Sequence, residues 1–292
     1  MDGSHSLGIK AEYARPRSIA EALALLGTGG WSVLAGGTDF FPALRDRPAE
    51  GRILDITGLA ELKGIREDAH HWRIGALTSW SDIIAGDLPP AFNALKLAAR
   101  EVGSVQIQNR ATIAGNLCNA SPAADGVPPL MVLDAAVVVT SRAGSRTLAL
   151  DAFVLGNRAT ALAPGEIVTE ILIPKSSSLG TAHFVKLGAR KYLVISIAMV
   201  AARLSMDQKG RIETAAVSVG ACSAVARRMV DLEGKLIGHP ATPKTFATIT
   251  ADDISTLTPI DDVRAPASYR LDAAAELARR AFVGCLPAEE RR

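Results

Sequence analysis

Apolar residues at helical spacing predict the first element, a helix over 19–26. Ser18 precedes it and Glu21 follows three residues later, which is the capping-box pattern at a helix start. Short apolar runs then predict a strand over 32–37, which ends in two glycines, and a second strand over 52–57. The first sixty residues therefore predict a small α/β unit.

A second run of strands and helices extends to residue 174. Alternating apolar positions predict a strand over 72–76, and helical spacing predicts helices over 80–84 and 91–103. Two strands joined by a turn are expected within 135–150, and a further strand over 165–174 stops at a proline. This second α/β region ends near residue 174.

The serine-rich segment 175–180 is the best domain boundary in the chain. Beyond it, three consecutive strand candidates cover 182–190, 194–204 and 211–222. Helical patterns follow over 224–238, 243–250 and 269–284. The patterns thus predict an α+β C-terminal domain, and they divide the chain into units of residues 1–60, 61–176 and 177–292.

Composition and charge are those of a soluble globular protein. The 292 residues include 48% hydrophobic and 21% charged residues, enough to bury a substantial core. A net charge of +2, with the 32 lysines and arginines spread along the chain, predicts no nucleic-acid partner. The longest apolar stretch, 194–202, is far below the roughly 18–20 residues of a membrane helix, and the chain start lacks a signal pattern.

Cysteines and histidines predict no metal site. Cys118, Cys222 and Cys285 are far apart and have no ligand spacing, so we expect reduced thiols and a cytoplasmic setting. The five histidines form no i, i+4 pair. We also find no triad of a hydrolase and no carboxylate pair, so no catalytic residue is predicted in this chain.

Two short glycine loops are the candidates for ligand binding. "AGGTD" (35–39) and "TIAGN" (112–116) could each present backbone amides to a phosphate, although ordinary tight turns would have the same composition. A P-loop is absent, and "GTGGWS" (27–32) lacks the third glycine of a Rossmann fingerprint. The second loop lies in a long polar segment, 102–135, which is typical of a ligand site or a mobile loop.

Taken together, the two loops resemble a known family. "VLAGGTDFFPALRDRP", followed by "VGSVQIQNRATIAGNLCNASPAAD", is similar to the FAD-binding medium subunits of the molybdenum hydroxylases, the xanthine dehydrogenase and carbon monoxide dehydrogenase type. The similarity extends over almost the whole chain. Two positions depart from the family pattern, Gln108 for an arginine and Ala114 for the first glycine of a G-G-N triplet. If that position requires a positive φ, alanine would strain the loop.

The resemblance implies an α+β fold with a two-part α/β FAD-binding domain of the vanillyl-alcohol-oxidase-like (PCMH) type. A C-terminal domain of a three-stranded antiparallel sheet with helices would follow. The implied FAD-binding residues are Val33, Leu34, Ala35, Gly36, Gly37, Thr38, Asp39, Leu77, Val102, Thr112, Ile113, Ala114, Gly115, Asn116, Ser121, Asp125, Val168 and Lys186.

The resemblance also implies roles for these residues. Amides of Gly36 and Gly37 and the Thr38 hydroxyl would hold the FAD diphosphate, with 112–116 on its other side. Asp39 would cap the following helix or bind a hydroxyl. Asp125 would accept a hydrogen bond from a sugar or ribityl hydroxyl, although a turn role is also open. Lys186 would lie near the flavin carbonyls, or it could simply be solvated. Tyr192 could cover the flavin.

Apolar residues would complete the cofactor site. Leu77, Val102 and Val168 would pack on the flavin or adenine, and for these three plain core packing is an equal alternative.

The implied function is electron transfer through FAD. Partners would be an iron-sulfur small subunit with two [2Fe-2S] clusters and a molybdopterin large subunit that carries the substrate site, with an external electron acceptor. Two alternatives stay open. The chain could be a self-contained FAD oxidoreductase of the same fold, or a non-catalytic assembly protein that has lost the flavin.

Overall fold

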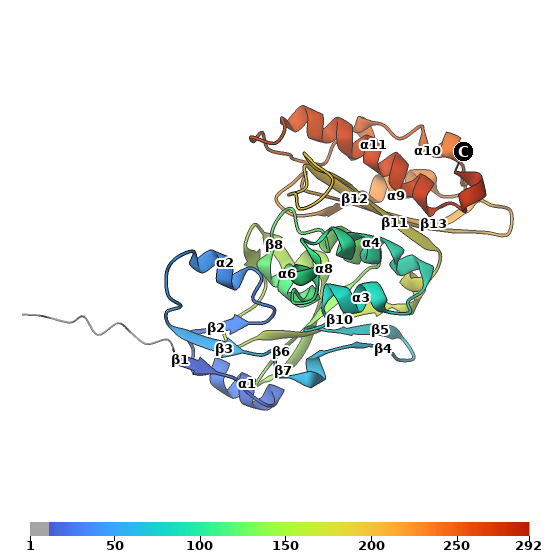
Figure 1. The fold of residues 1–292 in the computed structure, drawn as a ribbon. Coiled ribbons are helices and arrows are strands. Elements are labelled where there is room, and N and C mark those ends of the chain that lie inside the picture. The colour runs from blue at the N-terminus through green and yellow to red at the C-terminus, as the bar shows by residue number, and fades with distance from the viewer. Residues whose placement is uncertain (1–11, 292) are drawn as a thin grey trace, which may run out of the picture.

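The computed structural model describes residues 12–291, so the chain start and the expectation about its targeting lie outside the described residues. A parallel three-stranded sheet begins the fold, in the order β1 (Glu12–Ala14), β3 (Arg52–Asp55), β2 (Trp31–Leu34). Helix α1 (Ile19–Leu26) packs on it with its predicted apolar face, and the Ser18 hydroxyl accepts the amide of Glu21 at 3.2 Å. Figure 1 shows this unit beside the second one.

A five-stranded antiparallel sheet forms the second unit. Its strands, in order across the sheet, are β4 (Ile65–Glu67), β5 (His71–Gly75), β10 (Ile167–Pro174), β6 (Ala136–Ser141) and β7 (Gly144–Ala149). Helices cover one face around a core that includes Trp80, Phe92 and Phe153. They are α3 (Trp80–Ala85), α4 (Asn93–Glu101), α5 (Val105–Gln108), α6 (Ile113–Asn119), α7 (Val127–Val132) and α8 (Leu150–Phe153).

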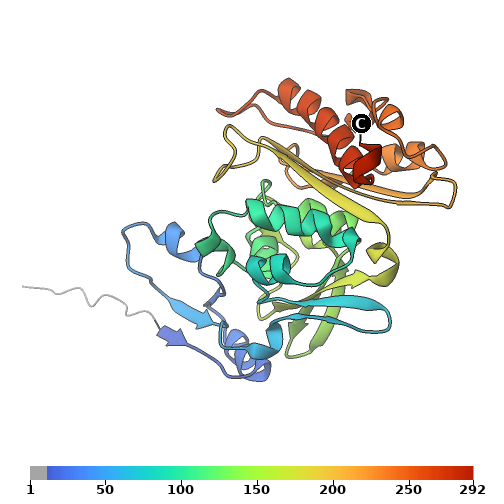
Figure 2. The same cartoon turned by 45° about the vertical axis from the view of Figure 1, so that its right-hand side comes forward.

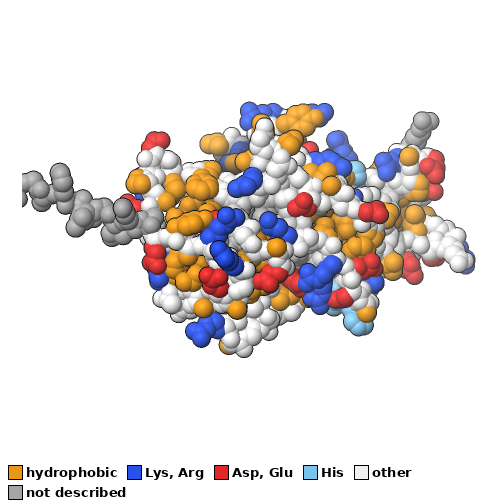
Figure 3. Space-filling model, turned by 60° about the horizontal axis from the view of Figure 1, so that its bottom comes forward, with side chains coloured by type: hydrophobic (Ala, Val, Ile, Leu, Met, Phe, Trp, Pro, Cys, Tyr) orange, Lys and Arg blue, Asp and Glu red, His pale blue; other side chains and the backbone are white. Residues whose placement is uncertain are grey.

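The opposite face of this sheet is polar. Glu170 on β10 is ion-paired with both Arg66 and Arg73, and Arg73 also pairs with Asp68. Figure 3 shows Lys and Arg side chains interspersed with Asp and Glu on this lower side of the molecule. The helices therefore cover only one side of the sheet.

The C-terminal unit is an antiparallel sheet between two helical layers (Figures 1 and 2). Its strands are β11 (Thr181–Leu187), β12 (Ala198–Met206), β13 (Ile212–Gly220) and β14 (Arg227–Arg228). One face packs against α9 (Val230–Leu236), α10 (Pro243–Phe246) and α11 (Ala267–Cys285), and the other packs against α4 and α7. The three predicted strands are present, together with a short fourth one.

Short elements complete the described chain. A small β-hairpin lies between α8 and β10, and turns of 3-10 helix occur along the chain. The hairpin strands are β8 (Val154–Gly156) and β9 (Ala159–Thr160), and a short α-helix, α2 (Phe40–Leu44), follows the first glycine loop. The 3-10 turns are η1 (Ala60–Leu62), η2 (Pro90–Phe92), η3 (Lys175–Ser178), η4 (Ala251–Ile254) and η5 (Ala288–Glu290). No helix within residues 12–291 has the length and apolar character needed to cross a membrane.

Two sequence expectations about local structure were wrong. The segment 102–135 is not an irregular loop, because it contains the short helices α5, α6 and α7. The helix expected over 224–238 is a strand, β14, followed by the shorter helix α9. In each case the helices have at most seven residues, too few for a helical period to be distinguished in the sequence.

The second and C-terminal units are joined at the end of α7. The Arg203 side chain donates to the carbonyl of Val132 at 2.7 Å, and Arg228 donates to the carbonyl of Met131 at 2.9 Å. Asp134, just beyond the helix, accepts from both guanidinium groups. Cations at the last carbonyls of a helix are favourable, so these contacts hold the two units together.

Candidate cofactor site

A cavity of about 470 Å³ lies where the parallel sheet meets β10 and the helices α3 and α6. Four chain segments, 33–40, 76–80, 102–119 and 162–168, line it together with Ile56. Its volume falls in the usual range for small-molecule sites. Of the predicted residues, those lining it are Val33, Ala35, Gly36, Gly37, Thr38, Asp39, Leu77, Val102, Thr112, Ala114, Gly115, Asn116 and Val168.

The first glycine loop approaches the backbone of the second. A Cβ on Gly36 would lie 2.0 Å from the carbonyl oxygen of Arg110, so only glycine fits there. Gly37 has φ +76°, a left-handed conformation that favours glycine. Within residues 12–291, the amides of Gly36, Gly37 and Thr38 donate to no protein acceptor. Three consecutive backbone donors on the cavity wall are suited to an anion.

The second loop offers fewer free donors than the sequence suggested. The Thr112 hydroxyl caps α6 by accepting the amide of Gly115 at 3.0 Å, and the amides of Ile113, Ala114 and Asn116 donate to backbone carbonyls. Ala114 is helical, so the departure from the family's glycine brings no strain. The first loop is therefore the better phosphate site.

Gln108, the other departure, points away from this loop. Its side-chain amide donates to the carbonyl of Arg100 at 3.1 Å, which ties α5 to the end of α4.

Two buried polar atoms on the cavity wall lack a partner. In the part of the chain that the structure describes, the Trp80 Nε1 and the Asn116 Oδ1 have no hydrogen-bond partner. Both residues line the cavity and lie against Gly126, where a Cβ would come within 2.5 Å of the indole and 2.7 Å of Asn116 Oδ1. A buried donor and acceptor left unsatisfied are costly. Each atom is itself enclosed by protein, although the residue that carries it lines the cavity, so neither atom contacts a ligand unless its side chain turns.

Five predicted residues lie outside this cavity lining. Leu34 and Ile113 are buried in the core, and the Ser121 hydroxyl accepts the amide of Ala123 at 3.3 Å. Asp125 accepts from Lys186 Nζ at 2.6 Å, and both side chains are less than a tenth exposed. Lys186 is therefore buried, not solvated.

Asp125 bridges two parts of the fold. It also accepts the Ser196 hydroxyl at 2.8 Å, and burial raises the pKa of its carboxyl while Lys186 lowers it. Because Lys186 belongs to β11, the buried pair connects the chain after α6 to the C-terminal sheet. Tyr192 is exposed, with the Lys191 ammonium 5.2 Å from its ring.

Asp39 occupies the N-cap position of α2, but its side chain makes no capping hydrogen bond. Its carboxylate instead accepts from Arg158 Nη1 at 2.7 Å. The expectation that Asp39 caps this helix was wrong, because the guanidinium competes successfully for the same oxygen atoms.

Several cavity residues were not predicted from the sequence. They are Phe40, Ile56, Ala76, Trp80, Ile107, Ala111, Cys118, Asn119, Leu162, Glu166 and Ile167. Most are apolar residues whose pattern is that of core positions, so sequence gives no sign that they face a cavity. Cys118 and Asn119 are different, since they come soon after "TIAGN" and one further helical turn would have included them.

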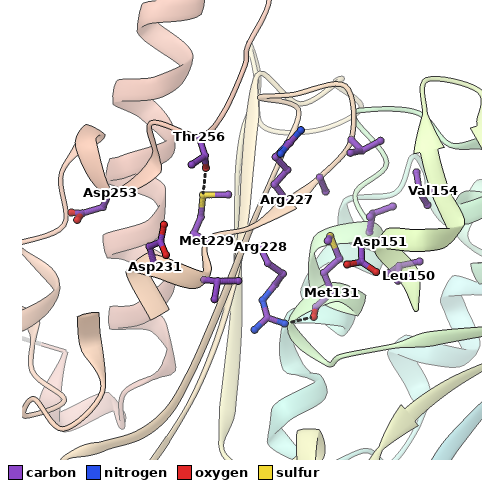
Figure 4. Close-up of a pocket in the computed structure, with 14 residues that line it drawn as sticks. Met131, Leu150, Asp151, Val154, Arg227, Arg228, Met229, Asp231, Asp253 and Thr256 are labelled. Atoms are coloured by element: carbon purple, nitrogen blue, oxygen red, sulfur yellow. Dashed lines mark hydrogen bonds between the residues drawn. The ribbon is translucent and has the colours of Figure 1, made fainter. Parts of the chain in front are cut away.

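A second cavity, of about 520 Å³, lies between the second and C-terminal units (Figure 4). Met131 and Met229 are among its apolar lining residues, and Arg227, Asp151 and Asp231 add charge. Neither glycine loop contributes to it. The glycine-loop cavity is therefore the better candidate for a dinucleotide.

The fold and the cavity define a dinucleotide-binding protein built from a two-part α/β domain and an antiparallel sheet domain. Comparison with known families identifies the class more closely. Residues 9–176 match the FAD binding domain in molybdopterin dehydrogenase, and residues 183–284 match the CO dehydrogenase flavoprotein C-terminal domain. The chain belongs to the family of FAD-binding medium subunits of the molybdopterin dehydrogenases.

Individual relatives agree with this assignment. The chain is 34% identical over 243 residues to the nicotinate dehydrogenase FAD-subunit of Eubacterium barkeri, covering 80% of this chain and 82% of that one. It is 30% identical to the carbon monoxide dehydrogenase medium chain of Hydrogenophaga pseudoflava, covering 93% and 95%. A solved structure of Cu,Mo-CO dehydrogenase matches with a TM-score of 0.84 at 29% identity, covering 97% and 99%. The predicted family, fold class and FAD cofactor are confirmed.

Proposed function

We propose that this chain carries electrons through FAD within a multi-subunit molybdenum hydroxylase. Electrons would come from [2Fe-2S] clusters on a small partner subunit and leave to an external acceptor, while a molybdopterin large subunit holds the substrate. Three consecutive unpartnered amides on the cavity wall, at Gly36, Gly37 and Thr38, carry this proposal. Relatives named as FAD-subunits and medium chains of dehydrogenases support it.

Different cavity residues would bind different parts of FAD. The amides of 36–38 bind the diphosphate. Leu77, Val102 and Val168 exclude water from the ring systems. Bound flavin supplies a carrier that exchanges electrons with one-electron and two-electron partners.

Further expectations about the chain accompany this proposal. The division of the chain into units 1–60, 61–176 and 177–292 remains a prediction. A reducing cytoplasmic setting is also proposed, and it is supported by three free thiols, Cys118, Cys222 and Cys285.

A flavin assay tests the cofactor site. The purified chain is expected to release FAD on acid treatment, identified by its mass, and Gly37→Trp is expected to abolish FAD binding. Gly37 has a left-handed backbone, and its Cβ would lie 2.7 Å from the Phe41 ring. Gly234→Ala is the matched control, because a Cβ there meets nothing within 4 Å.

The assembled complex tests the electron route. With Gly37→Trp in the complex, substrate is expected still to reduce the iron-sulfur clusters, seen by their absorbance, while turnover with the external acceptor is lost. Turnover that continues without FAD would overturn the proposal.

A further inference from the structure

The charged residues that line the glycine-loop cavity are not those expected of an anion site. Among residues 12–291, those that line it include two carboxylates, Asp39 and Glu166, and no lysine, arginine or histidine. The diphosphate of FAD is itself an anion, and anions are normally bound where the local field is positive. Asp39 directly follows the three unpartnered amides in the chain, so its charge lies close to the proposed phosphate position.

Each of these carboxylates is paired with an arginine that lies outside the cavity lining. Arg146 binds Glu166 through two hydrogen bonds, at 2.7 and 2.9 Å. Arg158 Nη1 donates to Asp39 Oδ2 at 2.7 Å. Both carboxylates on the cavity wall are therefore ion-paired with an arginine.

The backbone places Arg158 with some strain. Arg158 lies in the turn between β8 and β9 with φ +59°, and its amide donates to the carbonyl of Ala120 at 2.9 Å. Ala120 is itself left-handed, at φ +46°, where it ends α6. Left-handed conformations are unfavourable for a non-glycine residue. Two such residues in contact fix the turn against the helix whose last residues, Cys118 and Asn119, line the cavity.

We propose that Arg158 is an FAD-positioning residue, which neutralises Asp39 so that the diphosphate can occupy the amides of 36–38. The proposal rests on the proposed FAD site and adds a residue that is not part of the cavity lining. Arg158 acts through Asp39: without the guanidinium, the carboxylate would repel the diphosphate. Removing that carboxylate as well would make Arg158 dispensable.

FAD affinity of the full chain tests the proposal. Arg158→Gln is expected to raise the Kd for FAD about three- to tenfold at low salt, where tenfold corresponds to about 1.4 kcal/mol. The difference should shrink at about 0.5 M salt, because exposed charges are then screened. Arg158→Lys keeps the charge and is expected to stay within twofold of wild type.

The double variant shows whether Arg158 affects FAD binding through Asp39. In an Asp39→Asn background, Arg158→Gln should change the Kd by less than twofold. Arg227→Gln is the matched control, since Arg227 is exposed, forms no ion pair within the described residues and lines the other cavity.

Three results would overturn the proposal. Arg158→Gln could bind FAD like wild type, it could weaken binding by the same factor in the Asp39→Asn background, or Arg158→Lys could be as weak as Arg158→Gln. A wild-type chain that binds no FAD at all would instead remove the proposed cofactor site, and this inference with it.

Discussion

Replacing Gly36 with alanine is expected to separate the two loops that bound the cavity. The new Cβ would lie 2.0 Å from the carbonyl oxygen of Arg110, 2.7 Å from its carbonyl carbon and 3.0 Å from the Cα of Ala111. All three atoms belong to the backbone, so rotation of a side chain cannot relieve the contact. The first loop must withdraw by about 1 Å or more to restore normal van der Waals distances.

The cost follows from two contributions. Overpacking of this kind typically costs about 1–3 kcal/mol in the free energy of unfolding. Gly234→Ala provides the reference, because Gly234 lies inside α9 in open space and alanine favours a helix by about 1 kcal/mol. The two glycine-to-alanine variants should therefore differ by about 2–4 kcal/mol.

Urea denaturation followed by tryptophan fluorescence measures this difference, since the free energy falls linearly with denaturant. FAD content after gel filtration measures the effect on the site, and Gly36→Ala is expected to retain much less FAD than Gly234→Ala. Equal urea midpoints and equal FAD content would refute the reasoning, because the loops would then not meet at Gly36.

Two further predictions concern a helix cap and a carboxylate. Thr112→Val removes the hydroxyl that accepts the Gly115 amide, so the free energy of unfolding should fall by about 0.5–2 kcal/mol in urea titrations. The backbone amide of Arg264, with help from Arg270, lowers the pKa of Asp262 to about 2, against about 3.9 when unfolded. A carboxyl group whose pKa is lowered by folding stabilises the folded protein at pH values above its unfolded pKa. The loss in free energy of unfolding caused by Asp262→Asn should therefore be complete above about pH 5 and shrink as the pH falls towards 2.

Matched controls accompany these variants. Thr112→Ser keeps a capping hydroxyl and should recover most of the loss, and no recovery would contradict the capping role. Asp231→Asn is the control for Asp262→Asn, since it changes an exposed carboxylate without an ion pair in the described residues. A deficit of Asp262→Asn that is as large at pH 2 as at pH 7 would show that charge is not its origin.

Much of the fold could be predicted because its long elements have clear periods. The helix α1 and the strands β10 to β13 follow apolar patterns in the sequence. The segment 102–135 was misjudged because α5 and α6 have only four and seven residues, too few to show a helical period. The strand β14 pairs with β13, and a local sequence pattern does not show which strands will pair.

The cavity was predicted in part for a similar reason. Glycine loops are visible in the sequence, since Gly36 and Gly37 meet steric requirements that few other residues satisfy. By contrast, the Asp39 carboxylate could have capped α2 or paired elsewhere, and its choice of Arg158 joins residues 119 positions apart. Nor does a local pattern show that Lys186 reaches Asp125, because those residues meet only when β11 packs on the second unit.

The buried pair of Asp125 and Lys186 has a consequence for how the chain folds. Adjacent residues of a strand point to opposite faces, so a one-residue slip of β11 would turn Lys186 away and leave the buried Asp125 without its cation. Stranding one partner of a buried pair costs about 3–5 kcal/mol. The pair thus favours one alignment of β11 against the second unit over alignments shifted by one residue, so it helps to specify how the C-terminal sheet packs.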